Sequence, residues 1–324
     1  MKLSEQEAVI FSHAQHRASD SAPAIAKSSS RKVHTIRYCL KRLEERGLIN
    51  RYCFLDLCPL GFQEYVFYVS LSSVDAKTRK LFVNYIKHAD CVPFMIEVGG
   101  EFEYAISIVA KSIFTVSRFL KALGEQYGNL VANKSLTQRT SWIVYGKKYL
   151  TSKKFRVVPF LSKITEKQIK VDELDIKLME ELSTNSSSSN RELANVLGIP
   201  SSTVDFRLAR LREQGIIVGF GYSLNVRALG IQAYRLLIYT KGLHPNLDEK
   251  MQSFCRQHLL ICALVECLGT WDYEIVAESQ DAQEIVALGQ ELREKFGDSI
   301  EQVKLLASLR VVKHSVYCLS EYLK

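Results

Sequence analysis

One stretch of this sequence occurs twice, as Leu43-Glu44-Glu45-Arg46-Gly47-Leu48-Ile49 and, 168 residues later, as Leu211-Arg212-Glu213-Gln214-Gly215-Ile216-Ile217. A shift of 169 residues then superposes Leu60-Gly61-Phe62-Gln63-Glu64-Tyr65 on Leu229-Gly230-Ile231-Gln232-Ala233-Tyr234. A register that holds over half the chain with one insertion indicates a tandem duplication, because solenoid repeats are far shorter. Each half is therefore expected to be a complete module of two small domains.

The composition is that of a folded protein that needs no covalent staples. Of 324 residues, 47% are hydrophobic and 24% are charged, which argues against a disordered or fibrous chain. No run approaches 18 apolar residues, and the N-terminus lacks an apolar signal core. The eight cysteines form no Cys-x-x-Cys pair, and the seven histidines show no ligand spacing. We therefore expect a cytoplasmic protein with reduced cysteines and without metal, cofactor or membrane contact.

The first part of each half has the pattern of a winged helix-turn-helix (HTH) domain. In the second copy, apolar residues at helical spacing follow Asp172, and Gly198 permits the tight turn between two shorter helices. A strand-like run follows the third helix, as it does in the first copy. The third helix of the second copy is expected to be capped by one of three residues in sequence, Ser201, Ser202 or Thr203.

Charge differs between the two copies of this domain. The whole chain has a net charge of +8, and residues 1–55 hold 10 Lys and Arg against 5 Asp and Glu. Residues 171–224 hold 5 and 8. A basic domain gains affinity for a polyanion through counterion release, and an acidic one loses it. The first copy is therefore expected to bind DNA more strongly, although a basic face that only keeps the protein soluble would have the same composition.

The second part of each half predicts a strand-helix-strand-strand-helix-strand order, the ferredoxin-like unit. The sheet of such a unit has helices on one face only, so its other face must be covered by another copy. We expect the two sheets to pack face to face within one chain, and we expect self-association through these domains. The predicted divisions are HTH domains at 1–56 and 171–224, ferredoxin-like domains at 57–148 and 225–324, and a basic linker at 149–170.

Each half resembles the Lrp/AsnC (feast/famine) transcription regulators. The residues that carry this resemblance are Asp172-Glu173-Leu174-Asp175, Gly198-Ile199-Pro200-Ser201-Ser202-Thr203-Val204, Gly269-Thr270-Trp271-Asp272-Tyr273, Gly100-Glu101-Phe102-Glu103-Tyr104 and Thr137-Gln138-Arg139-Thr140-Ser141. The resemblance implies an α+β fold, with a DNA-binding winged helix and a ferredoxin-like domain that binds amino acids and drives assembly. The first copy departs from the family pattern at Ser30, where Gly is usual, and at Cys39, where Arg is usual.

The resemblance and the charges together predict the residues of a DNA-binding site and of an effector-binding site. Residues expected to contact double-stranded DNA are Arg31, Lys32, His34, Arg37, Lys41, Arg42, Ser201, Ser202, Thr203, Arg207 and Arg210. Residues expected to hold an amino-acid-like effector are Gly100, Glu101, Phe102, Glu103 and Tyr104, together with Gly269, Thr270, Trp271, Asp272 and Tyr273. In the second set, backbone N–H groups would take a carboxylate, and Glu103 or Asp272 an ammonium. A hairpin turn whose aromatics pack in the core is the structural alternative.

Two other functions fit the same fold. Siroheme decarboxylases resemble this family and also occur as fused pairs, but their His-Asn-Tyr stretch is absent, and only His88 and His258 flank the corresponding strands. A sensor that binds small molecules or proteins without DNA is the other alternative. Because the two copies differ, a DNA-binding chain would prefer an asymmetric site with half-sites about one helical turn (~34 Å) apart.

Overall fold

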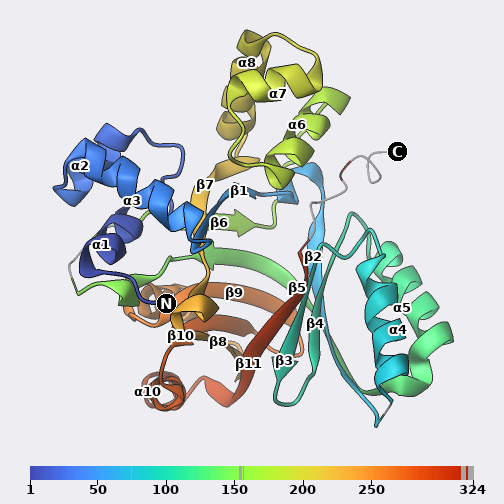
Figure 1. The fold of residues 1–324 in the computed structure, drawn as a ribbon. Helices are drawn as coiled ribbons and strands as arrows, with labels where there is room; N and C mark the ends of the chain where they lie inside the picture. The colour runs from blue at the N-terminus through green and yellow to red at the C-terminus, as the bar shows by residue number, and fades with distance from the viewer. Residues whose placement is uncertain (74, 153–154, 156, 315–318, 320–324) are drawn as a thin grey trace.

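The computed structural model describes residues 1–324 apart from 74, 153–154, 156, 315–318 and 320–324. Two helical heads lie at one end of a β-barrel, and paired helices cover the barrel from outside (Figure 1). Within the described residues, no helix is long and apolar enough to cross a membrane. The architecture is the expected α+β fold, with two winged helices and two ferredoxin-like units.

Each head consists of three helices followed by a strand. The first head contains α1 (Glu5–Ala14), α2 (Ala22–Ser29), α3 (Val33–Glu45) and β1 (Ile49–Leu55). The second contains α6 (Glu173–Thr184), α7 (Asn190–Leu197), α8 (Ser201–Glu213) and β7 (Ile217–Leu224). Capping boxes begin α1, α6 and α7, which satisfies N–H groups that have no partner inside the helix. The expected cap of α8 is wrong: Pro200 occupies the N-cap, and the three hydroxyl residues lie in the first turn.

Both bodies follow the strand-helix-strand-strand-helix-strand order. The first contains β2 (Gln63–Leu71), α4 (Ala76–Lys87), β3 (Phe94–Gly99), β4 (Tyr104–Ala110), α5 (Ile113–Tyr127) and β5 (Val131–Val144). The second contains β8 (Gln232–Thr240), α9 (Leu247–Gln257), β9 (Ile261–Gly269), β10 (Tyr273–Ser279), α10 (Ala282–Phe296) and β11 (Ile300–His314). Apolar side chains between each helix pair and its sheet form two separate cores.

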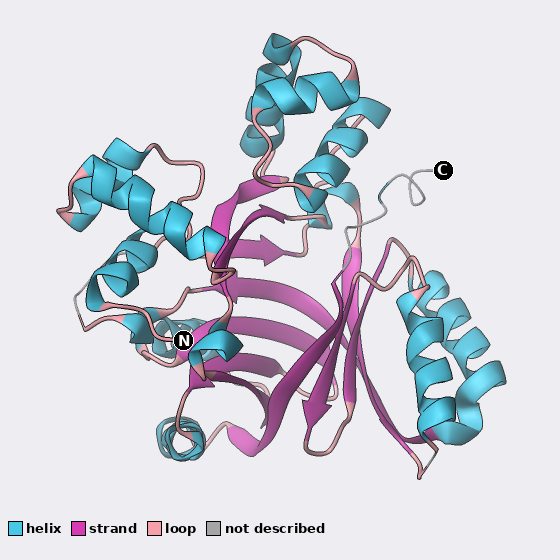
Figure 2. Ribbon diagram, in the orientation of Figure 1, coloured by secondary structure: helices cyan, strands magenta, loops and turns pink. Residues whose placement is uncertain are grey.

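The two sheets join at both edges into one closed barrel (Figure 2). Strand β3 pairs with β11 and strand β5 pairs with β9, both antiparallel. In these joints Gly99 faces Ala307, and Gln138 faces Leu268. A shift of 169 residues exchanges these two pairs, as an approximate two-fold axis between the halves requires. The face of each sheet that its own helices leave uncovered thus encloses a shared interior.

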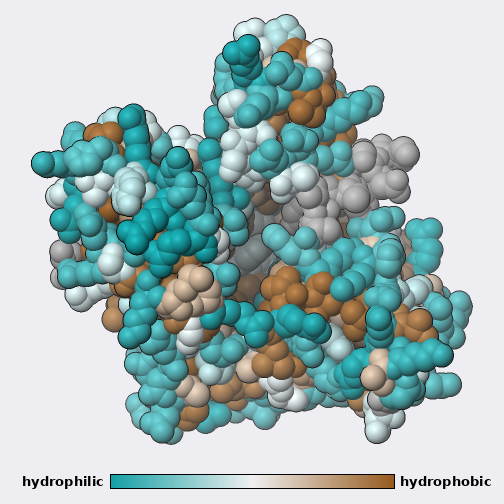
Figure 3. Space-filling view, viewed as in Figure 1, coloured by the Kyte–Doolittle hydropathy of each residue, from teal (hydrophilic) through white to brown (hydrophobic). Residues whose placement is uncertain are grey.

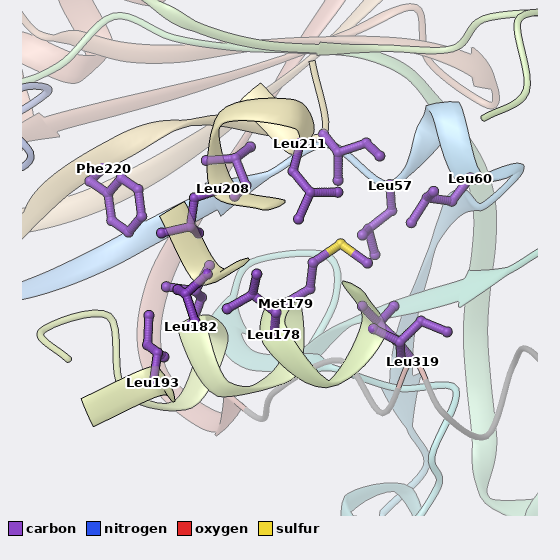
Figure 4. Packing of buried hydrophobic residues seen from close by; sticks show 14 of the residues in the cluster. Leu57, Leu60, Leu178, Met179, Leu182, Leu193, Leu208, Leu211, Phe220 and Leu319 are labelled. Atoms are coloured by element: carbon purple, nitrogen blue, oxygen red, sulfur yellow. The ribbon is translucent and has the colours of Figure 1, made fainter. Parts of the chain in front are cut away.

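The two heads are interlocked through their strands. Strands β1 and β7 pair antiparallel, with Tyr52 opposite Gly221 and Cys53 opposite Phe220. Leu57 and Leu60 of the first half lie in the apolar core of the second head, in the same cluster as Met179 and Leu211 (Figure 4). Reciprocally, a cluster of the first head contains Leu224, Leu229 and Ile231 of the second half. Each head therefore completes its core with residues of the other half.

The segment expected as a basic linker is partly folded onto the body. Strand β6 (Phe160–Lys163) pairs with the end of β5, and the ring of Phe160 stacks on His16 at a centroid distance of 4.3 Å. In the segment after β5, the ammonium of the half-buried Lys147 lies 2.7 Å from a carboxylate oxygen of Glu278. Glu278 also accepts a 2.5 Å hydrogen bond from the hydroxyl of Tyr149. The stacking thus joins β6 to the first head, and the contacts of Glu278 join the segment after β5 to the second body.

A network of charged groups fills part of the barrel interior. Glu274 is only 1% exposed and accepts hydrogen bonds from Arg235 and, at 2.9 Å, from the hydroxyl of Tyr68. Arg139 lies 3.8 Å from the same carboxylate and donates a 2.7 Å hydrogen bond to Glu64. Burial alone would raise the pKa of Glu274, but the guanidinium groups of Arg235 and Arg139 outweigh it and hold the pKa below its ordinary value.

We predict that Glu274→Ala strongly destabilises the fold, because it leaves two buried arginines without their shared carboxylate. The expected loss is about 3–5 kcal/mol of unfolding free energy, measured by urea denaturation. Glu97→Ala is the matched control, since its pair with the exposed Arg310 also bridges the halves, and it should cost about 1 kcal/mol or less. Equal losses in the two variants would contradict a stabilising role for the network.

Candidate nucleic-acid interface and turn sites

The outward face of α3 is basic. Ile36, Leu40 and Leu43 are buried against the first head, so residues between them turn toward solvent. The exposed basic residues of this face, all among those nominated from the sequence, are Lys32, His34, Arg37, Lys41 and Arg42. Arg31 is half-buried. Lys41 has an acidic neighbour one turn away, Glu45, at 3.7 Å in an exposed pair that is worth little. Figure 3 shows a largely hydrophilic surface over this head.

The third helix of each head, α3 or α8, is the one expected to enter DNA and is called the recognition helix below. The turn that precedes it has the same backbone conformation in both heads. Gly198 adopts the left-handed conformation with φ 66°, and Ser30 adopts it with φ 54°. A side chain in this region costs about 1 kcal/mol or more, and glycine avoids that cost. The departure at Ser30 therefore leaves the helix-turn-helix geometry intact at some expense in stability.

The arginines of α8 are not placed as the sequence suggested. Arg207 donates to Asp172 and to the fully buried Asp175, each at 2.7 Å, and Arg210 also pairs with Asp175. Hydrogen bonds from Arg207 hold the pKa of Asp172 below its ordinary value. Both guanidinium groups thus bind the start of α6, and this competes with any contact to phosphate. The prediction that Arg207 and Arg210 contact DNA stays a prediction, and such contacts would have to compete with these ion pairs.

In the first head, the carboxylate at the start of the first helix is paired with a different arginine. At the position of Arg207 this head has the buried Cys39, and its helix-start carboxylate, Glu7, is taken by Arg46 at 2.7 Å. Arg42 is consequently left on the exposed face. The recognition helix of the first head therefore presents several cations, whereas that of the second presents Asp205 and Arg212 together.

The two glycine turns lie at the joints of the barrel. Phe102 and Trp271 are buried in the shared interior, and Tyr104 and Tyr273 are buried under the helices of their own bodies. These aromatics pack in the core, as the structural alternative anticipated.

The carboxylates expected to hold an ammonium are also occupied. Glu103 pairs with Arg79, and Asp272 accepts hydrogen bonds from the backbone N–H and the hydroxyl of Thr240, both at 2.8 Å. The exposed parts of the two turns are Gly100 with Glu101 and Gly269 with Thr270.

The two turns make different contacts with the strand of the opposite half. Glu101 forms a 2.7 Å ion pair with Lys304. At the equivalent positions, the hydroxyls of Thr270 and Ser135 form a 2.6 Å hydrogen bond. A pocket of about 380 Å³ lies beside this hydroxyl pair, lined mainly by apolar residues of α5 and β5, with Lys134 at its edge. Sequence reasoning missed Ser135 and Lys134, although the 169-residue shift that matches Ser135 to Lys304 was available.

The cysteine thiols and the histidines that flank β3 and β9 are the remaining candidates for reactive groups. The seven described cysteines are unpaired by disulfides, and burial raises the pKa of Cys39 to about 11, so its thiol stays protonated. Cys318 lies outside the described residues. His88 is exposed, and His258 lies 3.3 Å from Glu291 on the surface of α10. No metal-binding group of three His, Cys, Asp or Glu occurs in the part of the chain that the structure describes.

Comparison with known proteins places the chain among regulators. Residues 171–218 match the family model described as winged helix-turn-helix DNA-binding. The HTH-type transcriptional regulator Ptr1 of Methanocaldococcus jannaschii is 34% identical over 127 residues, which are 39% of this chain and 82% of that relative. The chain belongs to the Lrp/AsnC family of transcriptional regulators. An uncharacterized HTH-type regulator of Pyrococcus horikoshii, PH1916, is 30% identical over 152 residues, which are 45% of this chain and 97% of that relative.

Among solved structures, a siroheme decarboxylase, NirDL, in co-complex with an iron-uroporphyrin III analogue, matches almost the whole length of this Lrp/AsnC-family chain. The TM-score is 0.61 at 11% sequence identity, and the match covers 97% of this chain and 93% of the decarboxylase. This likeness shows a shared fold over the length of both chains. Fold alone does not decide function, because one scaffold carries both regulators and enzymes.

We predict that replacing Arg37, Lys41 and Arg42 of α3 by Ala weakens DNA binding at every sequence. Each lost phosphate contact lowers the slope of log affinity against log salt by about 1. Fluorescence anisotropy over a salt series measures this slope. The control replaces three exposed lysines of α4, Lys77, Lys80 and Lys87, which removes the same charge from another surface. A sensor that does not bind DNA through α3 would respond equally to both triple variants.

Proposed function

We propose that this chain is a DNA-binding transcriptional regulator whose two halves act as an intrachain pseudo-dimer. The observation that carries this proposal is the pairing of β1 with β7, together with the exchange of core residues between the heads. Both heads lie at the same end of the barrel (Figure 1). One chain would therefore present two recognition helices to one duplex, as family dimers do with two chains.

The two heads are proposed to contribute unequally to binding. The exposed cations of α3 gain affinity by releasing counterions from DNA, whereas α8 has its arginines drawn to Asp172 and Asp175. The first head would supply most of the affinity, and the second would supply contacts from Ser201, Ser202 and Thr203 at the start of α8. An asymmetric operator follows from this difference.

We predict that DNA selected from a random pool contains two unlike half-sites and binds one chain per duplex. Stoichiometry is measured by analytical ultracentrifugation of the complex. Inverting one half-site should weaken binding by more than about tenfold, because each mismatched base pair costs about 1–3 kcal/mol. A palindromic site that requires two chains would contradict the pseudo-dimer.

We further propose that an amino acid or a related carboxylate binds at one turn only. The pocket beside Ser135 and Thr270 has an apolar lining, which suits an aliphatic or aromatic side chain. Lys134 at its edge can pair with a carboxylate, and the two hydroxyls can accept or donate hydrogen bonds. At the other turn, Glu101 already neutralises Lys304, so a ligand carboxylate would compete with an internal one.

We predict that the double variant Ser135→Lys/Thr270→Glu abolishes the response to the effector but not DNA binding. The two substitutions replace the Ser135–Thr270 hydroxyl pair by a Lys–Glu ion pair like that of Lys304 and Glu101 at the other turn. DNA affinity is measured with and without each of the twenty amino acids. The mirror variant, Lys304→Ser/Glu101→Thr, should respond like the wild type. A double variant that still responds, or a wild type that responds to none of the twenty, would contradict the proposed pocket.

A tetrapyrrole-modifying enzyme is a second candidate, because the decarboxylase fold matches over nearly the whole chain. The barrel interior of this chain is occupied by the Glu274 network and by the aromatic cluster around Trp271. A red-shifted absorbance band on adding an iron tetrapyrrole, with loss of carbon dioxide, would favour this candidate over DNA binding.

A further inference from the structure

Two exposed aromatic side chains occupy equivalent positions on the recognition helices. Tyr38 of α3 and Phe206 of α8 are related by the 168-residue repeat, and they are 66% and 65% exposed. Tyr38 lies two residues from each of the buried Ile36 and Leu40, which places it on the opposite side of the helix. Phe206 has the same relation to the buried residues on either side of it.

Nothing within the heads explains an aromatic residue at this position. Aromatic residues are less favourable in helices than Ala or Lys, and these two face away from the core. The neighbours have diverged between the copies, with Arg37 replaced by Asp205 and Lys41 by Ala209. At this position, between the diverged neighbours, both helices still carry an aromatic ring.

We infer that Tyr38 and Phe206 read thymine bases in the major groove by packing against the C5-methyl group. This inference rests on the proposed function, since it requires the helices to enter DNA. The methyl of thymine is the apolar group on the major-groove edge of base pairs, and apolar side chains contact it. Arg37 and Lys41 flank Tyr38, and their charge favours DNA over a neutral protein surface as the occupant of this face.

The two rings differ in one polar group. Phe206 offers only apolar surface, so the half-site under the second head is read there through the methyl alone. The hydroxyl of Tyr38 can also donate to or accept from a base edge or a phosphate. The second head has Asp205 and Ala209 beside its ring where the first has Arg37 and Lys41, and it therefore depends more on its ring for specificity than the first does.

Deoxyuridine, which lacks the methyl, tests this inference. DNA selected by the full-length chain is remade with each half-site's thymines replaced by deoxyuridine. Wild-type affinity should fall by about three- to fivefold for each contacted thymine, as expected for one buried methyl group. In Phe206→Ala, deoxyuridine in one half-site should no longer lower the affinity, and in Tyr38→Ala the same should hold for the other half-site. Tyr38→Phe keeps the ring, so deoxyuridine should still lower its affinity.

Phe114→Ala is the matched control, because Phe114 is an aromatic residue that is 80% exposed on α5, outside both heads. Deoxyuridine in either half-site should still lower the DNA affinity of this variant. Circular dichroism checks that every variant is folded. Selected sites without thymine, equal affinity for the two DNAs, or penalties that persist in both alanine variants would overturn the inference. Failure to select any DNA would overturn the proposed function itself.

Discussion

The fold depends on a buried carboxylate that both halves neutralise. Glu274 of the second half is held by its own Arg235, by Arg139 of the first half and by the hydroxyl of Tyr68. A charge buried without such partners costs several kcal/mol. The equivalent of Glu274 in the first half is Ala105 and that of Arg235 is Val66, so two identical halves would not reproduce the network. Glu274 gains Arg139 and Tyr68 as partners only when the first half closes on the second.

Closure of the barrel also determines where the heads lie. Strands β1 and β7 leave the heads, pair with each other and carry apolar residues into the opposite head. The stacking of Phe160 on His16 joins the first head to β6, and the Lys147–Glu278 pair joins the segment after β5 to the second body. The heads therefore pack against each other and are not independent domains joined by a flexible linker. A fixed distance between the two heads suits recognition of a DNA site of defined spacing.

The duplicated halves have kept their backbone and changed their chemistry. In the heads, the carboxylates at the start of α6 bind the arginines of α8, whereas in the first head Arg46 takes Glu7 and Arg42 stays exposed. At the turns, an ion pair on one side corresponds to a hydroxyl pair beside a pocket on the other. Fusion of two copies in one chain permits this divergence, because each site can change without altering its counterpart.

The repeat, the apolar spacing and the glycine at each turn determined much of this protein before its structure was known. Helix and strand preferences are local, and so the order of elements and the winged-helix and ferredoxin-like units follow from the sequence. The pairing of Arg207 with Asp175, the burial of Phe102 and Trp271 and the sharing of Glu274 between halves did not follow. These contacts join residues from 32 to 206 positions apart. A motif does not show whether a charged side chain will face solvent or an internal partner. Only the tertiary structure decided which nominated side chains remain available to a ligand, because that depends on what packs against them.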